Sequence, residues 1–381
     1  MRTTHAVVAL ALLAGCRQKP TPQAQPAPAA PPLTTTSAAS AGTAPRAAVA
    51  PSSSAAPPGV VADQPCKALG KKGTTELSPI NEAELQLAAA PEALYALGYT
   101  HELARVKLYR FSRAGGPVEA VAEQKGLGDR KQFALASGAA YYTQAGKLVR
   151  LGPEKGEAHV LYEGMQSPVA VVGDQVLGIA CDSKAKFDRL LQIPTTGGQP
   201  QLVAELPHGS GGTCRYSSVV ADQRDVFIAD WNGHSVVAVS LADKSVKNIV
   251  TKRGFPGPLL LESDALVYLS TDGLNRVARD GSASKRLADS DRALAPYSYI
   301  AESTNDYWVF DALAYAPTTT LHRIPRAGGP AQAVMVLKNA DPSAGPEMGQ
   351  GLVDFAVDDQ CVYVAQTQYK RTGIQLLVKA L

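Results

Sequence analysis

Leu321-His322-Arg323-Ile324 is one copy of a four-residue phrase: an apolar residue, any residue, a basic or polar residue, and a second apolar residue, followed by a turn. The seven copies begin at Leu108, Leu148, Leu190, Val236, Leu274, Leu321 and, more loosely, Ile374. Successive copies start 40, 42, 46, 38, 47 and 53 positions apart. A period of this length indicates that one supersecondary unit is repeated along the chain.

Each phrase is flanked by further strand signals. An apolar and aromatic segment precedes every copy, at residues 94–97, 140–143, 176–179, 226–229, 266–269, 307–310 and 362–365. Aromatic and β-branched enrichment of this kind predicts strands. A shorter strand ahead of most segments, such as residues 218–221, and a fourth after a Gly-bearing turn, such as residues 331–336, complete four antiparallel strands per unit.

Seven units of four strands predict an all-β, seven-bladed β-propeller formed by residues 66–381. Six or eight blades are the alternatives that the uneven spacing leaves open. The last unit lacks an outer strand, because only residues 379–381 follow Val378. We expect residues 73–77 to supply that strand and so to join the two ends of the fold without a broken seam.

Residues 1–16 are a processing signal rather than part of the fold. Arg2 is followed by a short apolar run, residues 6–13, which is too short to span a bilayer. The run ends in Leu13-Ala14-Gly15-Cys16, which resembles a bacterial lipobox. The resemblance implies that Cys16 is acylated, with palmitate among the acyl groups, and becomes the new N-terminus. Arg17 is not the aspartate that retains such lipoproteins in the inner membrane, which implies an outer-membrane address. The alternative is an ordinary secretory signal.

Residues 17–65 consist almost wholly of Ala, Pro, Ser, Thr, Gln and Val, and we expect them to form a disordered tether. The whole chain has 37 basic and 34 acidic residues. Four basic residues and one acidic residue precede residue 66, so the folded part holds 33 of each and is formally neutral. A neutral domain exerts no general attraction on phosphate backbones, and we therefore expect no nucleic-acid partner.

Four cysteines remain when Cys16 is set aside, an even number that suits an exported domain. In a propeller, the loop after the second strand lies on the same face as the loop that enters the next blade. Cys181 and Cys214 fall on that face, and Cys66 and Cys361 fall on the opposite one. We predict the disulfides Cys181–Cys214 and Cys66–Cys361, the second stapling the ring closure. Free buried thiols are the alternative.

One unit also resembles a known repeat. Residues 225–237 read Asp-Val-Phe-Ile-Ala-Asp-Trp-Asn-Gly-His-Ser-Val-Val, which is similar to the core of an NHL repeat. Residues 321–329 and 108–116 resemble NHL-like and YWTD-type bacterial propellers. The resemblance covers residues 85–381 as architecture. It implies a scaffold that binds proteins, glycans or small molecules, whereas a minority of such domains are lyases or metal-dependent lactonases.

The face that carries Cys181 and Cys214 is rich in polar and aromatic loop residues, and rigid scaffolds usually carry their function on loops. The candidate ligand-binding residues are His208, Arg215, Tyr216, Asp230, Trp231, Asn232, His234, Arg253, Tyr315 and Tyr369. Each has a structural alternative: His234 would bond a neighbouring blade, and Asp230 would cap a turn through backbone N–H groups. No histidines have metal-ligand spacing, and we predict no metal site, no cofactor and no catalytic residue.

The sequence therefore predicts a monomeric, lipid-anchored envelope propeller that binds a protein or carbohydrate partner without catalysis. The rival hypothesis is an exported propeller enzyme, a lactonase or lyase, that uses a metal in its central channel. Such a site would need acidic ligands from several blades.

The lipid anchor is tested by replacing its attachment residue. We expect the full chain, expressed in a Gram-negative host, to incorporate an alkyne-labelled palmitate and to sediment with membranes. Cys16→Ser should lose the label and leave the membrane fraction, because the acyl chains attach only there. Cys181→Ser, which keeps Cys16, is the matched control. Equal labelling of Cys16→Ser and the parent would contradict the prediction.

Overall fold

The computed structural model describes residues 75–80, 84–90, 93–100, 105–112, 118–125, 133–152, 158–181, 185–207, 214, 216–252, 254–289, 299–310, 318–338, 352–358, 360–367 and 374–380. All of these residues belong to the unit Val61–Leu381, and every element among them is a strand. No helix long and apolar enough to cross a membrane occurs in the described part of the chain.

The described strands form seven sheets of four antiparallel strands each, and each sheet is one blade. Blade 1 holds β2 (Glu84–Ala89), β3 (Leu94–Thr100), β4 (Arg105–Phe111) and β5 (Glu119–Lys125). Blade 2 holds β6 (Ala134–Ala136), β7 (Ala139–Gln144), β8 (Lys147–Leu151) and β9 (Ala158–Glu163). Blade 3 holds β10 (Met165–Val172), β11 (Gln175–Ala180), β12 (Phe187–Pro194) and β13 (Gln201–Pro207).

The remaining blades repeat this order. Blade 4 holds β14 (Tyr216–Ala221), β15 (Asp225–Asp230), β16 (Ser235–Ser240) and β17 (Val246–Thr251). Blade 5 holds β18 (Leu259–Leu261), β19 (Ala265–Ser270), β20 (Gly273–Ala278) and β21 (Ser284–Asp289). Blade 6 holds β22 (Tyr299–Glu302), β23 (Asp306–Phe310), β24 (Thr318–Pro325) and β25 (Gln332–Lys338). Blade 7 holds β26 (Leu352–Val357), β27 (Cys361–Thr367), β28 (Ile374–Ala380) and β1 (Thr75–Ile80).

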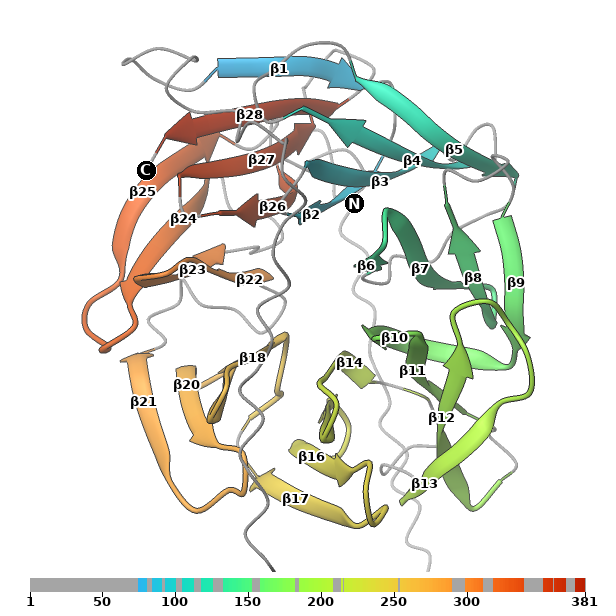
Figure 1. Ribbon diagram of the computed structural model, residues 1–381. Helices are drawn as coiled ribbons and strands as arrows, with labels where there is room; N and C mark the ends of the chain where they lie inside the picture. The colour runs from blue at the N-terminus through green and yellow to red at the C-terminus, as the bar shows by residue number, and fades with distance from the viewer. Residues whose placement is uncertain are drawn as a thin grey trace, which may run out of the picture. The chain divides into compact units, whose positions relative to one another are not determined.

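The seven blades form a ring with the first strand of each blade innermost, which confirms the predicted seven-bladed propeller (Figure 1). The predicted ring closure is also confirmed, because β1 pairs with β28 as the outer strand of blade 7. The strand covers residues 75–80 rather than 73–77. Chain segments from both ends of the domain thus share one sheet, so blade 7 is complete and the ring closes without a broken seam.

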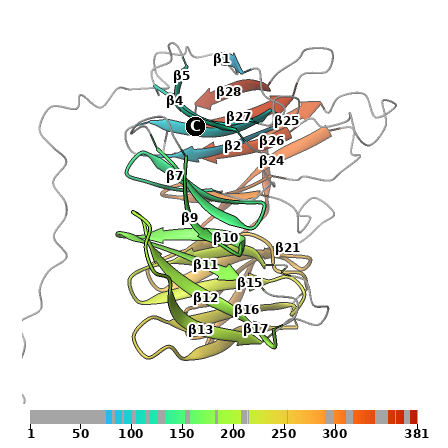
Figure 2. The same ribbon diagram turned by 90° about the vertical axis from the view of Figure 1, so that its right-hand side faces the viewer.

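The strands run between the two faces of the ring, which differ in their connections (Figure 2). We name as the loop face the one that carries the connections from second to third strands and from blade to blade. The opposite turn face carries the turns from first to second and from third to fourth strands. Among the candidate residues predicted from the sequence, those that the structure describes lie at strand ends or in a connection of the loop face.

The burial pattern explains why the repeated phrase has apolar first and fourth residues. In blade 5 the first residue, Leu274, packs in a cluster with Tyr307 and Val309 of blade 6. The fourth residue, Val277, packs with Phe227 of blade 4. Side chains at these positions point to opposite faces of the sheet. Both faces of a blade are buried against neighbours, and each interface between adjacent blades holds one hydrophobic cluster.

The seventh copy of the phrase begins two residues later than the sequence suggested. The first residue of the other copies pairs with the last residue of the preceding apolar segment, as Leu321 pairs with Phe310. In blade 7 the partner of Ala365 is Leu376, not Ile374. The loose match at residues 374–377 was misaligned because several apolar residues follow one another there, so the pattern alone does not determine the register.

A buried carboxyl joins the last blade to the first. Asp354 in β26 is 7% exposed, and its Oδ2 accepts a hydrogen bond of 2.7 Å from the backbone N–H of Leu87 in β2. In blade 4, Ser218 makes the equivalent bond to the backbone N–H of Leu259 in blade 5. Desolvation raises the pKa of Asp354 to about 7, although two backbone N–H groups partly oppose the shift. The seam between the ends of the chain therefore contains a titratable group.

Asp354 should make the stability of the propeller depend on pH. Its folded-state pKa lies above the unfolded value, so folding takes up a proton between about pH 4 and 7, and stability falls as the pH rises through that window. Between pH 5 and 8, the free energy of unfolding of Asp354→Asn should fall by about 3 kcal/mol less than that of the parent. Denaturant unfolding at several pH values measures this difference. Asp243→Asn is the control, because the pKa of exposed Asp243 is lowered and it stays ionised over this range. Parallel curves for Asp354→Asn and the parent would refute the assignment.

Candidate functional site

A disulfide on the loop face joins blades 3 and 4. Cys181 follows β11 and Cys214 precedes β14, and the two are bonded with a Cα–Cα distance of 5.7 Å. This confirms the first predicted pairing. Cys361 also takes part in a disulfide. The second predicted partner, Cys66, lies outside the described residues, so the pairing Cys66–Cys361 stays a prediction.

Beside the disulfide, a tyrosine and a carboxylate link the same two blades. Tyr216 begins β14, and its hydroxyl donates a hydrogen bond of 2.7 Å to Oδ2 of Asp188 in β12. Asp188 is only 2% exposed. Burial of the phenol, followed by its bond to the carboxylate, raises the pKa of Tyr216. The hydroxyl therefore stays protonated and remains a donor at physiological pH.

Asp230 ends β15 directly opposite Tyr216 and caps the turn that follows. Its Oδ1 accepts a hydrogen bond of 2.9 Å from the backbone N–H of Gly233. Burial raises the pKa of Asp230, with a smaller contribution from the nearby charge of Asp188, while backbone N–H groups of the turn oppose the shift. The capping role expected from the sequence is confirmed. A Cβ at residue 233 would collide with the Asp230 carboxylate, which would have to leave its capping position.

An aromatic cluster stands over this turn. The rings of Trp231 and Phe255 stack with centroids 4.8 Å apart and an interplanar angle of 28°. The ring of His234 lies 4.4 Å from that of Phe255, and its Nδ1 is 3.2 Å from the carbonyl oxygen of Gly254. His234 thus contacts the connection to the next blade, which is the structural role that the sequence analysis gave as its alternative to ligand binding. Phe255 is 38% exposed, so the cluster presents a rigid aromatic surface to solvent.

The structure brings together half of the candidate ligand-binding residues. Tyr216, Asp230, Trp231, Asn232 and His234 lie at one end of β14 and β15 or in the turn that follows. Asp188 was missed by the sequence reasoning, because an aspartate at the second position of a strand carries no local signal. The other candidates, His208, Arg215, Arg253, Tyr315 and Tyr369, lie outside the described residues, as does Cys16.

This arrangement favours a role of the loop face as a binding surface for a partner molecule. Stacked aromatic rings held by a disulfide and by buried hydrogen bonds lose little conformational freedom when a partner covers them. Aromatic residues of this kind are common at the energetic centres of interfaces. Among the described residues, no group of three or more His, Cys, Asp or Glu side chains is placed to hold a metal ion.

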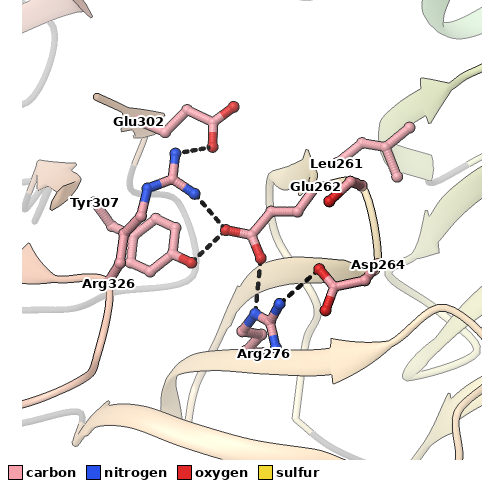
Figure 3. Close-up of a pocket in the computed structure, with 8 residues that line it drawn as sticks. Leu261, Glu262, Asp264, Arg276, Glu302, Tyr307 and Arg326 are labelled. Atoms are coloured by element: carbon pink, nitrogen blue, oxygen red, sulfur yellow. Dashed lines mark hydrogen bonds and ion pairs between the residues drawn. The ribbon is translucent and has the colours of Figure 1, made fainter. Parts of the chain in front are cut away.

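A polar hollow of about 510 Å³ lies on the turn face between blades 5 and 6, and its centre is Glu262 (Figure 3). This carboxylate accepts hydrogen bonds from Arg276 at 2.7 Å, Arg326 at 2.6 Å and the Tyr307 hydroxyl at 2.5 Å. Arg276 also pairs with Asp264 at 2.8 Å. Burial and the bond to Glu262 raise the pKa of Tyr307. The charges in this hollow satisfy one another.

A related ion pair joins blades 4 and 5. Arg279 follows the phrase of blade 5 as Arg326 follows that of blade 6, and it pairs with Asp222 at 2.7 Å and Asp225 at 3.0 Å. In both cases an arginine beyond the third strand reaches an acidic residue before the second strand of the preceding blade. The extended phrase apolar-x-Arg-apolar-x-Arg is the sequence signal that could have identified these inter-blade pairs.

Three comparisons with known proteins were informative only at the level of the fold, through solved structures that align with a TM-score of 0.50 or more. No protein-family model and no curated protein matches the chain. Oligogalacturonate lyase in complex with manganese aligns with a TM-score of 0.52 and 11% identity, over 82% of this chain and 98% of that one. The AfRom2 CNH domain aligns with a TM-score of 0.50 and 8% identity, over 81% and 99% of the two chains. BamB from Moraxella catarrhalis aligns with a TM-score of 0.47 and 14% identity, over 81% and 100%.

The class of protein is therefore defined by its architecture: the chain is a β-propeller. Identities this low show the fold alone, and one fold serves unrelated activities. The function must be argued from the residues on its two faces.

The turn after β15 provides a test of the site geometry. Gly233→Ala should lower the free energy of unfolding by about 1–3 kcal/mol, because the added Cβ displaces the Asp230 carboxylate. In an Asp230→Ala background the same substitution should cost much less, because the obstructing group is gone. Denaturant unfolding of the four-variant cycle measures the coupling. Additive effects would show that the two residues do not compete for this space.

Proposed function

We propose that this β-propeller is a lipid-anchored protein of the bacterial cell envelope, related to NHL-like and YWTD-like propellers. In this proposal it is monomeric, and it binds a protein or carbohydrate partner through the loop face of blades 3 to 5. The stacked pair of Trp231 and Phe255 carries the proposal. The Asp230 cap holds the turn that carries Trp231, and the disulfide and the Tyr216–Asp188 bond join this blade to blade 3.

The chemistry around the pair supports a recognition surface rather than a catalytic one. Trp231 is half-buried and Phe255 is 38% exposed, so together they offer apolar area that water solvates poorly. On the loop face of blade 3, Lys186 lies 5.3 Å from the ring centroid of Phe187 at the start of β12, which adds a cationic group to this face. An apolar centre with a polar surround is the usual anatomy of a protein interface.

The envelope address rests on the lipobox-like residues 13–16, the Pro-rich segment 17–65 and the disulfide. Disulfides persist in oxidising compartments, which an exported domain occupies. In the proposed arrangement, Cys16 is acylated and the segment 17–65 tethers the propeller to the outer membrane. The rival function, a metal-dependent lactonase or lyase, requires a set of channel ligands, and no described residues form one.

The binding surface is tested in cells by photo-crosslinking. We expect a benzophenone amino acid at Phe255 to give a discrete adduct of higher mass. The same group at Val336, which is 59% exposed on the outer strand β25 of blade 6, should give none. Introducing Trp231→Ala into the Phe255 probe should reduce the adduct about tenfold or more, because a buried aromatic anchor is worth about 2 kcal/mol or more.

The adduct identifies the class of partner by mass and by its sensitivity to protease or glycosidase. Equal adducts from both positions, or an adduct at Phe255 that Trp231→Ala leaves unchanged, would refute the proposed surface. No adduct from Phe255 in cells that retain the folded protein would refute it as well.

A further inference from the structure

The connection between blades 4 and 5 is tied to both blades, which fixes the position of Phe255. The Ser217 hydroxyl of β14 donates a hydrogen bond of 2.8 Å to the carbonyl oxygen of Pro256. The backbone N–H of Gly257 donates one of 2.7 Å to the carbonyl oxygen of Leu269, near the end of β19. The exposed ring of Phe255 is thus carried by a segment that loses little freedom when a partner covers it.

A lysine begins this connection beside the aromatic cluster. Thr251 at the end of β17 pairs with Ser235 at the start of β16, so the next residue, Lys252, lies beside His234. The side chain of Lys252 is exposed, as is that of Lys186, which precedes β12 in blade 3. None of the ion pairs among the described residues includes either lysine. Both lysines therefore present a positive charge to solvent on the loop face.

The two aspartates of this site are engaged inside the scaffold. Asp188 is 2% exposed and accepts the hydrogen bond of the Tyr216 hydroxyl. Asp230 is half-buried and accepts the hydrogen bond of the Gly233 N–H. A partner that covers the aromatic cluster from outside therefore meets the lysines before it meets these carboxylates.

Other charges limit the positive region of the loop face. In blade 3 the exposed residues Arg189 and Glu205 are direct partners across β12 and β13, so their charges offset each other. On the side of blade 5, Gly254 packs so closely against Thr271 that a Cβ would collide with it. The residue after Thr271 is Asp272, which is half-buried. The surface is therefore positive toward blades 3 and 4 and negative toward blade 5.

We propose that the loop face binds a protein partner through an acidic segment that carries an apolar anchor side chain. The anchor packs on the pair of Trp231 and Phe255, since such aromatic residues are common at the energetic centres of interfaces. The acidic side chains of the segment lie over Lys252 and Lys186, away from Asp272. Complementary charges of this kind orient a partner and speed its association.

This inference rests on the proposed function, because it names the partner of the same surface. An anionic glycan would also suit the lysines, but it has no apolar side chain to cover the exposed part of Phe255. An apolar centre with a charged rim is the anatomy of a protein interface. The acidic segment is therefore assigned to a protein chain.

Tryptophan fluorescence of the purified full chain provides a direct test. The chain has two tryptophans, and Trp308 is only 1% exposed, so a change on binding reports mainly on Trp231. A random copolymer of glutamate and tyrosine should bind saturably, and about 0.5 M salt should weaken it about tenfold. A copolymer of lysine and tyrosine, and the anionic glycan alginate, should each bind at least tenfold more weakly. Absence of saturable binding, or alginate binding as tightly, would overturn the inference.

Three variants locate the charges. Lys252→Glu should weaken binding of the glutamate–tyrosine copolymer at least tenfold, and Asp272→Asn should strengthen it about twofold or more, because it removes a repelling charge. Lys125→Glu reverses an exposed charge on the same face of blade 1 and is the control, which should bind as the parent does. Circular dichroism and thermal unfolding confirm that each variant is folded. Equal effects of Lys252→Glu and Lys125→Glu would overturn the inference.

The photo-crosslinking probe at Phe255 separates this inference from the proposed function. A protease-sensitive adduct that Lys252→Glu reduces and Lys125→Glu does not would support both. An adduct that only glycosidase digests, or that Lys252→Glu leaves unchanged, would overturn the acidic protein segment while the loop face remains the binding surface. Absence of any adduct in cells that retain the folded protein would overturn both.

Discussion

The whole molecule depends on burying both faces of every sheet. A four-stranded antiparallel sheet exposes two apolar surfaces, and this chain covers both only by placing a neighbour on each side. The position of Leu274 toward blade 6 and of Val277 toward blade 4 shows how one strand serves two interfaces. The requirement is met for all blades only when the ring closes. For this reason β1 returns to pair with β28, and Asp354 of the last blade bonds Leu87 of the first.

The same constraint explains where chemistry is found. Strand interiors are occupied by packing, so polar groups collect at the ends of strands on either face. On the turn face they mostly satisfy one another, as Arg279 does with Asp222 and Asp225 across two blades. On the loop face, Asp230 and His234 hold a turn whose aromatic residues remain partly exposed. Candidate sites are therefore found where the polar groups at strand ends bond to one another and an exposed surface or a hollow remains beside them.

Because the seven blades repeat one another, unusual positions can be identified by comparing the blades within this one chain. Seven units with the same backbone register act as internal controls for one another. Glu262 and Asp264 pair with Arg276 in blade 5, for example, whereas blade 2 has Ala136 and Gly138 at these two positions. Differences between equivalent positions are therefore more informative about function than the phrase that all blades share.

From the sequence by itself, the blade count, the strands, the ring closure and the Cys181–Cys214 disulfide were predicted correctly, because each follows from local periodicity and strand direction. It also identified the turn at Asp230 and His234, where neighbouring residues carry the signal. Only the tertiary structure placed Asp188 against Tyr216, stacked Phe255 on Trp231 and set the register of Leu376. It alone packed Gly254 against Thr271 and tied Pro256 to Ser217. These contacts join different strands and blades, and their geometry depends on the closed ring, which no local pattern of residues encodes.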